Sequence, residues 1–400
     1  MLMWWHRVRG RASLAVAAGL VALVGVVSPV AAWDRTVILA DGYFVVLLED
    51  NDNIATTPTE AFALTDLEDG DANQAVGYQR SRLAFDTTGV MVLDNKCEKA
   101  EGIAADGTAV VAACSYGSTW DIWKLHLVVH TFVGGHWTPA VAVQGSTKPA
   151  SNSASIAISG SLVVIGWTDY KTGAIEIARS TDGGVTFKAP VRLGTTTARD
   201  IDPGSGRPMN GRVQVAIHGQ RMYAVWFSGS SSSKSQRGWP TGLKLRRSTD
   251  GGKTFGSGQT LVSGTELPGP GAMVATDTGV LILHATGKRS LRLLRSTDGG
   301  RTFRSSSLTS DKKVTGDLDL AVQGPSVRAI WRYGSHVYLR RSEDGGRTWA
   351  SQEYTGVTKR AGLDIHPNAG LLGAHTFVAL NEMSDWGGLG GQWVKATIAP

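Results

Sequence analysis

The chain has 400 residues, more than one ordinary hydrophobic core encloses, so it needs either two domains or a repeat architecture that grows by adding modules. Its 50 glycines and its short runs of Val, Ile, Leu, Trp and Thr are typical of strands joined by tight turns and argue against long amphipathic helices. The formal net charge is +6, and subtracting three arginines near the N-terminus leaves +3, which gives no evidence for nucleic-acid binding.

The N-terminal segment has the features of an export signal. Three arginines precede an almost uninterrupted apolar run, Ala12 to Val27, and Val30-Ala31-Ala32 offers a small-residue cleavage site. An uncleaved membrane anchor is the alternative, because the run approaches the length that spans a bilayer. Ser28-Pro29 breaks the helix before the small residues, which favours cleavage. We expect residues 1–32 to be removed and residues 33–400 to be secreted, without stable membrane insertion.

Two acidic segments follow, Glu49 to Asn53 and Asp66 to Asp71. Both concentrate the oxygen ligands that calcium prefers, but neither has complete EF-hand spacing. Solvated acidic loops are the simpler interpretation, and a calcium-binding loop is the alternative. We expect no other cofactor.

The two cysteines, Cys97 and Cys114, each lie near the end of an apolar stretch, with turn residues between them. In an exported chain we expect them to form a disulfide across a hairpin, and two buried free thiols are the alternative. A metal site is not expected, because no Cys or His cluster lies near them in the sequence. His126 and His130 fall four apart on an expected strand, about 13 Å from each other, too far to chelate one ion.

A turn sequence recurs four times. Ser-Thr-Asp-Gly-Gly-x-Thr-Phe occupies residues 180–187, 248–255 and 296–303, and Ser-Glu-Asp-Gly-Gly-Arg-Thr-Trp occupies residues 342–349. In each turn the Asp can accept backbone hydrogen bonds, the glycines allow positive φ, and the final ring can pack beneath the turn. The intervals between copies fit one four-stranded blade of a β-propeller, and the longest contains a Ser-rich run that we interpret as an inserted loop.

A strand, turn and strand precede each copy, at residues 156–167, 213–226, 273–284 and 318–331. Together with the segment from Ile103 these elements make five four-stranded modules. A sixth would combine residues 363–397 with N-terminal strands, because both chain ends commonly close a propeller. We therefore expect an all-β, six-bladed β-propeller of four-stranded antiparallel blades. Seven blades are the alternative, if residues 36–93 add one.

The four turns match the Asp-box pattern, so the chain resembles the sialidase (neuraminidase) superfamily and related BNR-repeat proteins. The resemblance implies that the boxes lie on the outside of the blades, remote from the active site, and that their aspartates are structural: Asp182, Asp250, Asp298 and Asp344. Family sialidases hold the substrate carboxylate with three arginines. They attack the anomeric carbon with a Tyr assisted by a Glu, and an Asp protonates the leaving oxygen.

The same resemblance suggests site residues. Glu266, in Glu-Leu-Pro-Gly-Pro, would be the assisting base, and Arg289, just before the third Asp-box strand, the second carboxylate clamp. Arg332 occupies the corresponding place one blade later, as the third clamp. The family's Arg-Ile-Pro sequence is missing, so Arg82 is the nearest substitute for the first clamp, and Asp94, after the same strand, is the candidate acid. Loop carboxylates and solvated arginines are the alternative interpretation of these residues.

The catalytic tyrosine is also missing, because residues 359–364 read Lys-Arg-Ala-Gly-Leu-Asp. Tyr354 lies seven residues before Ala361, a separation that shifts it away from the ring axis. Two functions stay open: a sialidase-like glycoside hydrolase acting on terminal sialic acid or a related acidic sugar, and a non-catalytic binding or assembly propeller with a protein partner. In either case we expect an exported propeller that recognises glycans or other anionic small ligands.

Overall fold

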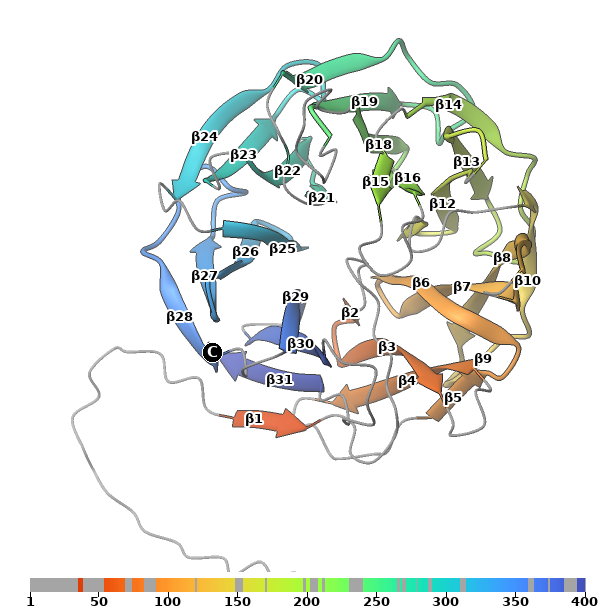
Figure 1. Cartoon of the computed structure of the whole chain (residues 1–400), viewed down its shortest axis with the longest axis horizontal. Coiled ribbons are helices and arrows are strands. Elements are labelled where there is room, and N and C mark those ends of the chain that lie inside the picture. The colour runs from red at the N-terminus through yellow and green to blue at the C-terminus, as the bar shows by residue number, and fades with distance from the viewer. Residues whose placement is uncertain are drawn as a thin grey trace, which may run out of the picture. The chain divides into compact units, whose positions relative to one another are not determined.

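A computed structural model gives the fold (Figure 1). It describes residues 35–38, 54–68, 74–82, 91–118, 121–147, 154–169, 171–196, 199–201, 208–210, 213–229, 240–264, 267, 271–277, 279–286, 290–309, 314–358, 363–372, 375–384 and 394–399. The expected signal, residues 1–32, and the acidic segment at residues 49–53 lie outside this set. The regular elements among the described residues are all β-strands. These ranges contain no helix long and apolar enough to cross a membrane.

The described strands form seven antiparallel blades, six four-stranded and one, blade 2, with a fifth short strand, numbered here as blades 1 to 7 in chain order. Blade 1 holds β2 (Ile54–Thr56), β3 (Glu60–Glu68), β4 (Gln74–Arg82) and β5 (Met91–Asp94). Blade 2 holds β6 (Cys97–Asp106), β7 (Ala109–Ser118), β8 (Asp121–Val133) and β10 (Val141–Thr147), and β9 (His136–Trp137) pairs with β8. Blade 3 holds β11 (Ser155–Ser159), β12 (Leu162–Thr168), β13 (Ala174–Ser180) and β14 (Val191–Thr195).

A separate two-stranded sheet, β15 (Arg199–Ile201) and β16 (Pro208–Asn210), precedes blade 4 in the chain. Blade 4 holds β17 (Val213–His218), β18 (Arg221–Ser228), β19 (Gly242–Ser248) and β20 (Gln259–Ser263). Blade 5 holds β21 (Ala272–Ala275), β22 (Val280–Ala285), β23 (Leu291–Ser296) and β24 (Arg304–Thr309). Blade 6 holds β25 (Val314–Gln323), β26 (Ser326–Tyr333), β27 (His336–Ser342) and β28 (Glu353–Thr358). Blade 7 holds β29 (Leu363–Leu372), β30 (His375–Ser384), β31 (Val394–Ala399) and the N-terminal β1 (Arg35–Ile38).

The blades close into a ring. The first strands of consecutive blades contact one another from β2 through β6, β11, β17, β21 and β25 to β29, and β29 in turn contacts β2 (Figure 1). In blade 7, β1 pairs with β31 from Arg35 opposite Ile398 to Ile38 opposite Lys395, so both chain ends share one sheet. This confirms the expected propeller and its closure by both ends. The ring has seven blades and not six, which is the alternative that the sequence left open, because residues 54–94 form a blade of their own.

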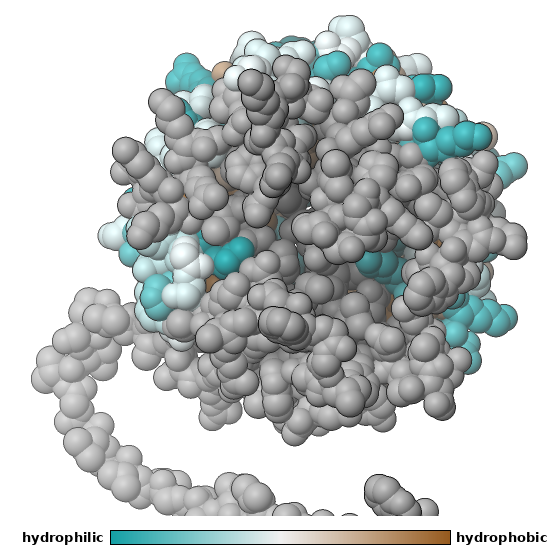
Figure 2. All heavy atoms as spheres, in the orientation of Figure 1, coloured by the Kyte–Doolittle hydropathy of each residue, from teal (hydrophilic) through white to brown (hydrophobic). Residues whose placement is uncertain are grey.

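In the blades whose burial is described throughout, the second strand is the most buried and the fourth strand is the most exposed. All seven residues of β12 and all six of β22 are buried, because a second strand is covered on both faces by neighbouring blades. The fourth strand β24 begins with four exposed residues, Arg304 to Ser307. The described residues at the edge of the face in Figure 2 are accordingly coloured mostly teal and white. The hydrophobic core is therefore a series of apolar layers between blades.

The Asp boxes join the third and fourth strands of blades 3 to 6. In blade 3, Ser180 Oγ donates to Asp182 Oδ1 over 2.6 Å and accepts from the Gly184 amide over 2.9 Å. Asp182 also accepts from the Thr186 amide at 2.9 Å and from its hydroxyl at 2.5 Å. The same bonds recur in the other three boxes. Each carboxylate is thus satisfied within its own turn.

The second glycine of each box faces the preceding blade. Gly184 has a φ of +94°, and a Cβ there would lie 2.8 Å from Thr131 Oγ1 of blade 2. Thr131 donates to the carbonyl oxygen of Gly183 over 3.0 Å. Between blades 4 and 5, Arg247 Nη1 donates to the carbonyl oxygen of Gly299 over 3.3 Å, and between blades 5 and 6, Arg295 Nε donates to that of Gly345 over 2.9 Å. The third strand of one blade therefore holds the Asp box of the next.

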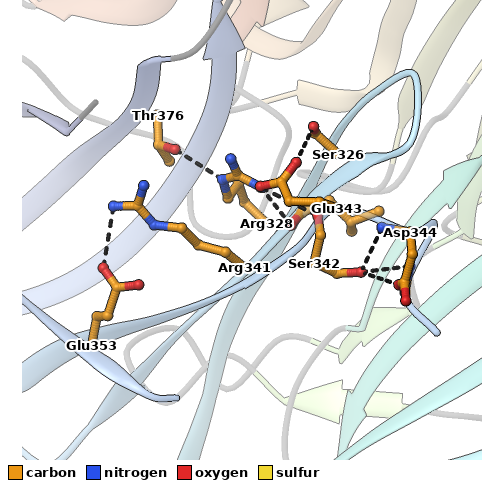
Figure 3. Close-up of polar contacts among 10 residues, drawn as sticks. Ser326, Arg328, Arg341, Ser342, Glu343, Asp344, Glu353 and Thr376 are labelled. Atoms are coloured by element: carbon orange, nitrogen blue, oxygen red, sulfur yellow. Dashed lines mark hydrogen bonds and ion pairs between the residues drawn. The ribbon is translucent and has the colours of Figure 1, made fainter. Parts of the chain in front are cut away.

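Blades 6 and 7 are joined by a buried arginine instead, because blade 7 contains no Asp box. Arg328 Nη1 lies 2.7 Å from Glu343 Oε1, and Arg328 Nε donates to Thr376 Oγ1 of β30 over 3.0 Å (Figure 3). The Arg328 side chain is 6% exposed, whereas that of Glu343 is 62% exposed. Burial lowers the pKa of Arg328 and Glu343 opposes this shift, so the guanidinium keeps its charge where the two blades meet.

Candidate functional site

A cavity of about 210 Å³ lies on the ring axis, lined by residues from the first strand of every blade. The described lining is apolar except for Thr56 and Asp319. Asp319 is 7% exposed, and its two carboxylate oxygens accept the amides of Leu320 and Ala369, each over 2.7 Å. Asp319 therefore links β25 to β29 in the channel wall. No Arg, Lys or His occurs among the described lining residues, so this stretch of channel offers no cation to an anionic ligand.

The described backbone places two of the three expected clamps at opposite ends of their blades. Arg332 pairs with Val337 beside the hairpin between the second and third strands of blade 6. Arg82 pairs with Glu60, the first residue of β3, beside the hairpin between the first and second strands of blade 1. In a four-stranded antiparallel sheet these hairpins lie at opposite ends. The side chain of Arg82, and all of Glu266 and Arg289, lie outside the described residues, so the clamp arrangement stays a prediction.

Asp94 lies on β5, the outermost strand of blade 1, against blade 2. Its Oδ1 accepts the Lys96 amide over 2.8 Å, and its Oδ2 accepts the Tyr116 hydroxyl and lies 3.2 Å from His130 Nε2. Burial, with help from the Asp94 carboxylate, raises the pKa of Tyr116. Asp94 is not among the described channel-lining residues. Its role as catalytic acid remains untested, and the contacts found here are with protein groups between two blades.

Cys97 and Cys114 form a disulfide between the neighbouring strands β6 and β7. Both are fully buried in the core shared by blades 1 and 2. The second acidic segment begins on β3, and its residues from 69 to 71, like the side chains of residues 66–68, lie outside the described set. Calcium there stays a prediction.

Tyr354 lies on β28, the outermost strand of blade 6, and is 43% exposed. Its ring centroid is 5.1 Å from that of His336 and 5.8 Å from that of Tyr338. Tyr333 is 5.8 Å from Tyr338 on the same side of the sheet. This position agrees with the sequence spacing, which puts Tyr354 away from the ring axis, so Tyr354 is not placed to attack a substrate in the channel.

These rings form an aromatic surface on the outer part of blade 6, named here the tyrosine surface and defined as Tyr333, His336, Tyr338 and Tyr354. Tyr338 also packs on the core shared with blade 5. Arg340 follows Tyr338 by two residues on the same face of β27. It is half-buried, and its Nε has no hydrogen-bond partner among the described residues. The sequence signal for this surface is the alternation of His336, Tyr338 and Arg340 along one strand.

Glu176 is a further titratable residue with a shifted pKa, and the sequence did not indicate it. Burial raises the pKa of Glu176 above its ordinary value, and the nearby Asp169 adds to the shift. Glu176 lies opposite Trp167 in the ladder between β12 and β13. Arg192 and the Trp167 indole act in the opposite direction. An isolated Glu between two apolar residues on a strand, Ile175 and Ile177, gives no sequence signal for such a shift.

No family model matches the chain, and no curated protein matches its sequence. Four Asp boxes on a closed ring of four-stranded blades decide the fold. It is a β-propeller with Asp-box turns. Solved structures with a similar fold include the BP39L lectin from Burkholderia pseudomallei, with a TM-score of 0.54 and 8% identity over 86% of this chain and 98% of the lectin.

The polysaccharide lyase Uly1 has a TM-score of 0.53 and 10% identity, over 88% of this chain and 90% of the lyase. The NanB sialidase from Streptococcus pneumoniae has a TM-score of 0.35 and 12% identity, over 84% of this chain and 74% of NanB. At these identities the comparisons describe the fold and not the reaction.

Proposed function

We propose that this propeller is exported and recognises glycans, in particular acidic glycans, or other anionic small ligands. The observation that carries the proposal is the tyrosine surface with Arg340 beside it. Aromatic rings pack against the C–H faces of sugar rings. A guanidinium offers paired donors that match a carboxylate. Two propellers of similar fold are named as a lectin and a polysaccharide lyase, which supports carbohydrate as the ligand class.

A glycan array probed with purified residues 33–400 tests this proposal. We expect retention on acidic glycans and a loss of at least about tenfold in signal for Tyr354→Ala. Val185→Ala is the matched control, because Val185 is 64% exposed in the Asp-box turn of blade 3. Retention of no glycan, or equal effects of the two substitutions, would count against recognition at the tyrosine surface.

Hydrolysis is a separate part of the proposal. On the sialidase hypothesis, Arg82, Arg289 and Arg332 hold the substrate carboxylate, Glu266 assists and Asp94 protonates the leaving oxygen. This requires Arg82 and Arg332 to reach one ligand from opposite ends of their blades. Incubation of the same protein with a fluorogenic sialoside, beside Glu266→Gln and Arg289→Ala, tests it. Turnover that both substitutions abolish supports the hydrolase, and no turnover, or turnover indifferent to both, ends that hypothesis.

A non-catalytic propeller with a protein partner is the second candidate. The position of Tyr354 on the outermost strand favours it, because no other tyrosine is available in the sequence near residue 361. The expected result is partner capture by the immobilised propeller without cleavage of any sialoside. Recovery of no protein by the wild-type propeller above a bare-resin control would remove this candidate.

A further inference from the structure

Three side chains that can bind a metal, those of Cys97, Cys114 and His130, cluster between blades 1 and 2, and Asp94, the candidate acid of the sialidase hypothesis, lies beside His130. Ligand atoms of Cys97, Cys114 and His130 lie within 4.8 Å of one another. The two cysteines are fully buried and His130 is 3% exposed. Asp94 adds a fourth ligand type, because its Oδ2 is 3.2 Å from His130 Nε2 and its side chain is only 14% exposed. Together they offer two sulfurs, one nitrogen and one oxygen.

The histidine is oriented as a metal ligand. His130 Nδ1 lies 3.0 Å from the carbonyl oxygen of Thr138, so Nδ1 carries the proton and donates it there. Nε2 faces Asp94 Oδ2 over 3.2 Å, and it is buried without a hydrogen bond among the described residues. A nitrogen and a carboxylate oxygen at this separation can share a proton or a cation. Donation of the other ring nitrogen to a carbonyl is the usual second-shell contact of a zinc-bound histidine.

The distance between the His130 and Asp94 ligand atoms is close to that in a tetrahedral zinc site. With zinc bonds of about 2.0 to 2.3 Å, neighbouring ligand atoms in a tetrahedron are about 3.3 to 3.8 Å apart. The separation of 3.2 Å between His130 Nε2 and Asp94 Oδ2 is close to the lower limit. The cysteine Cα atoms are 5.8 Å apart on neighbouring strands. Rotation of the two side chains can therefore separate the sulfurs, once they are no longer bonded, without movement of the strands.

We propose that reduction of the Cys97–Cys114 disulfide creates a buried Zn²⁺ site formed by Cys97, Cys114, His130 and Asp94. A dithiol reductant supplies two electrons and two protons, is itself oxidised to a disulfide, and leaves two thiols on the protein. Zinc binding then releases those two protons as the thiolates coordinate the ion. The oxidised chain has a covalent link between β6 and β7. The reduced chain has a metal link that also holds β5 and β8.

The sequence argues against a metal site, because no Cys or His cluster lies near either cysteine. The fold supplies the missing ligands from other strands: His130 comes from β8, and Asp94 from the neighbouring blade. The inference does not depend on glycan recognition, because none of its residues belongs to the tyrosine surface.

The test compares oxidised and reduced residues 33–400. The protein is reduced with a dithiol, desalted without air, and titrated with Zn²⁺ alone against a chromogenic chelator. We expect about one equivalent to bind the reduced protein and none to bind the oxidised protein with comparable affinity. Substitution of Co²⁺ should give the absorption of a tetrahedral site with thiolate-to-metal charge transfer. His130→Ala should weaken binding at least about tenfold. His136→Ala, an exposed histidine three residues after β8, should leave it unchanged.

Three results would overturn the proposal: no stoichiometric binding by the reduced protein, equal binding by the oxidised protein, or binding indifferent to His130→Ala. Circular dichroism of each variant shows whether it folds. The Co²⁺ spectrum of the wild-type protein reports the thiolate ligands without any substitution, so an unfolded variant does not decide the outcome. A reduced wild-type protein that is unfolded and stays unfolded with zinc also counts against the site.

Discussion

Arg295 of blade 5 donates a hydrogen bond from Nε to the carbonyl oxygen of Gly345, in the Asp box of blade 6, over 2.9 Å. Burial lowers the pKa of Arg295, and the neighbouring Arg347 adds to the shift. The side chain still carries its charge, because an arginine is not deprotonated at any ordinary pH. Since Arg247 makes the equivalent bond one blade earlier, the Asp boxes take part in contacts between blades as well as in their own turns.

Arg295→Ala should therefore lower the free energy of unfolding by about 1 to 3 kcal/mol, the usual cost of losing a hydrogen bond from a charged group. Arg292→Ala is the matched control, because Arg292 is exposed on the same strand, and its effect should stay within about 0.5 kcal/mol. Urea unfolding of the two variants beside the wild type measures the difference. Equal effects would mean that the bond to Gly345 contributes nothing.

The Asp boxes should make stability fall in acid. Hydrogen bonds from Ser180 and Thr186 lower the pKa of Asp182 from its ordinary value of 3.8 to about 2. A carboxyl with a lowered folded-state pKa stabilises the fold above its unfolded-state pKa, and this contribution is lost as the pH falls through the folded-state value. Asp182→Asn should be less stable than the wild type at pH 7, and the two should converge between about pH 4 and pH 2. A constant difference in thermal unfolding over that range would contradict this.

The contribution of Glu176 to stability should change with pH in the opposite direction to that of Asp182. Its pKa is raised, chiefly by burial, so its ionised form is less favourable in the folded state than in the unfolded chain. Stability from this group is present below the unfolded-state pKa and is lost as the pH rises through the folded-state value. Glu176→Gln should thus be slightly more stable than the wild type at pH 7 and equal to it near pH 4. Thermal unfolding at both values checks this, and a less stable variant at pH 7 would show that the carboxylate has a structural partner.

Removal of Arg328 should destabilise the fold more than removal of the charge on its ion-pair partner, Glu343. Arg328→Ala removes a buried charge together with its bond to Thr376 across blades 6 and 7, and should cost about 2 to 4 kcal/mol. Glu343→Gln should cost about 1 kcal/mol or less, because that side chain is 62% exposed. Denaturant unfolding separates the two values. A larger effect for Glu343→Gln would place the main contribution in the exposed carboxylate instead of the link between blades.

The fold was largely predictable because Asp boxes are local. The Ser, Gly and Thr within each eight-residue motif make the side-chain hydrogen bonds that fix its Asp, so the turn can be recognised from the local sequence. The hairpins expected before the motifs start close to the observed first strands. Blade 1 lacks such a turn, and its first strand, β2, has only three residues. Nothing local therefore marked residues 54–94 as a separate blade, and the predicted count was one short.

The sites were harder to predict because they depend on contacts between strands. Tyr338 faces Tyr354 across a ladder whose register shifts between His336 and Tyr338, and no local rule gives that shift. His130 and Asp94 meet only because blade 1 packs on blade 2. The resemblance to sialidases suggested roles for Arg289, Arg332 and Glu266. Whether these side chains meet in one site depends on loop and side-chain positions outside the described residues.

Calorimetric titration of residues 33–400 with an acidic oligosaccharide and its neutral counterpart tests the central claim, recognition of acidic glycans at the tyrosine surface. We predict tighter binding of the acidic sugar, a preference that Arg340→Gln removes and Arg292→Gln leaves intact. Tyr354→Ala should weaken binding of both sugars. The account would be contradicted if neither sugar bound, or if binding persisted unchanged in Arg340→Gln and Tyr354→Ala.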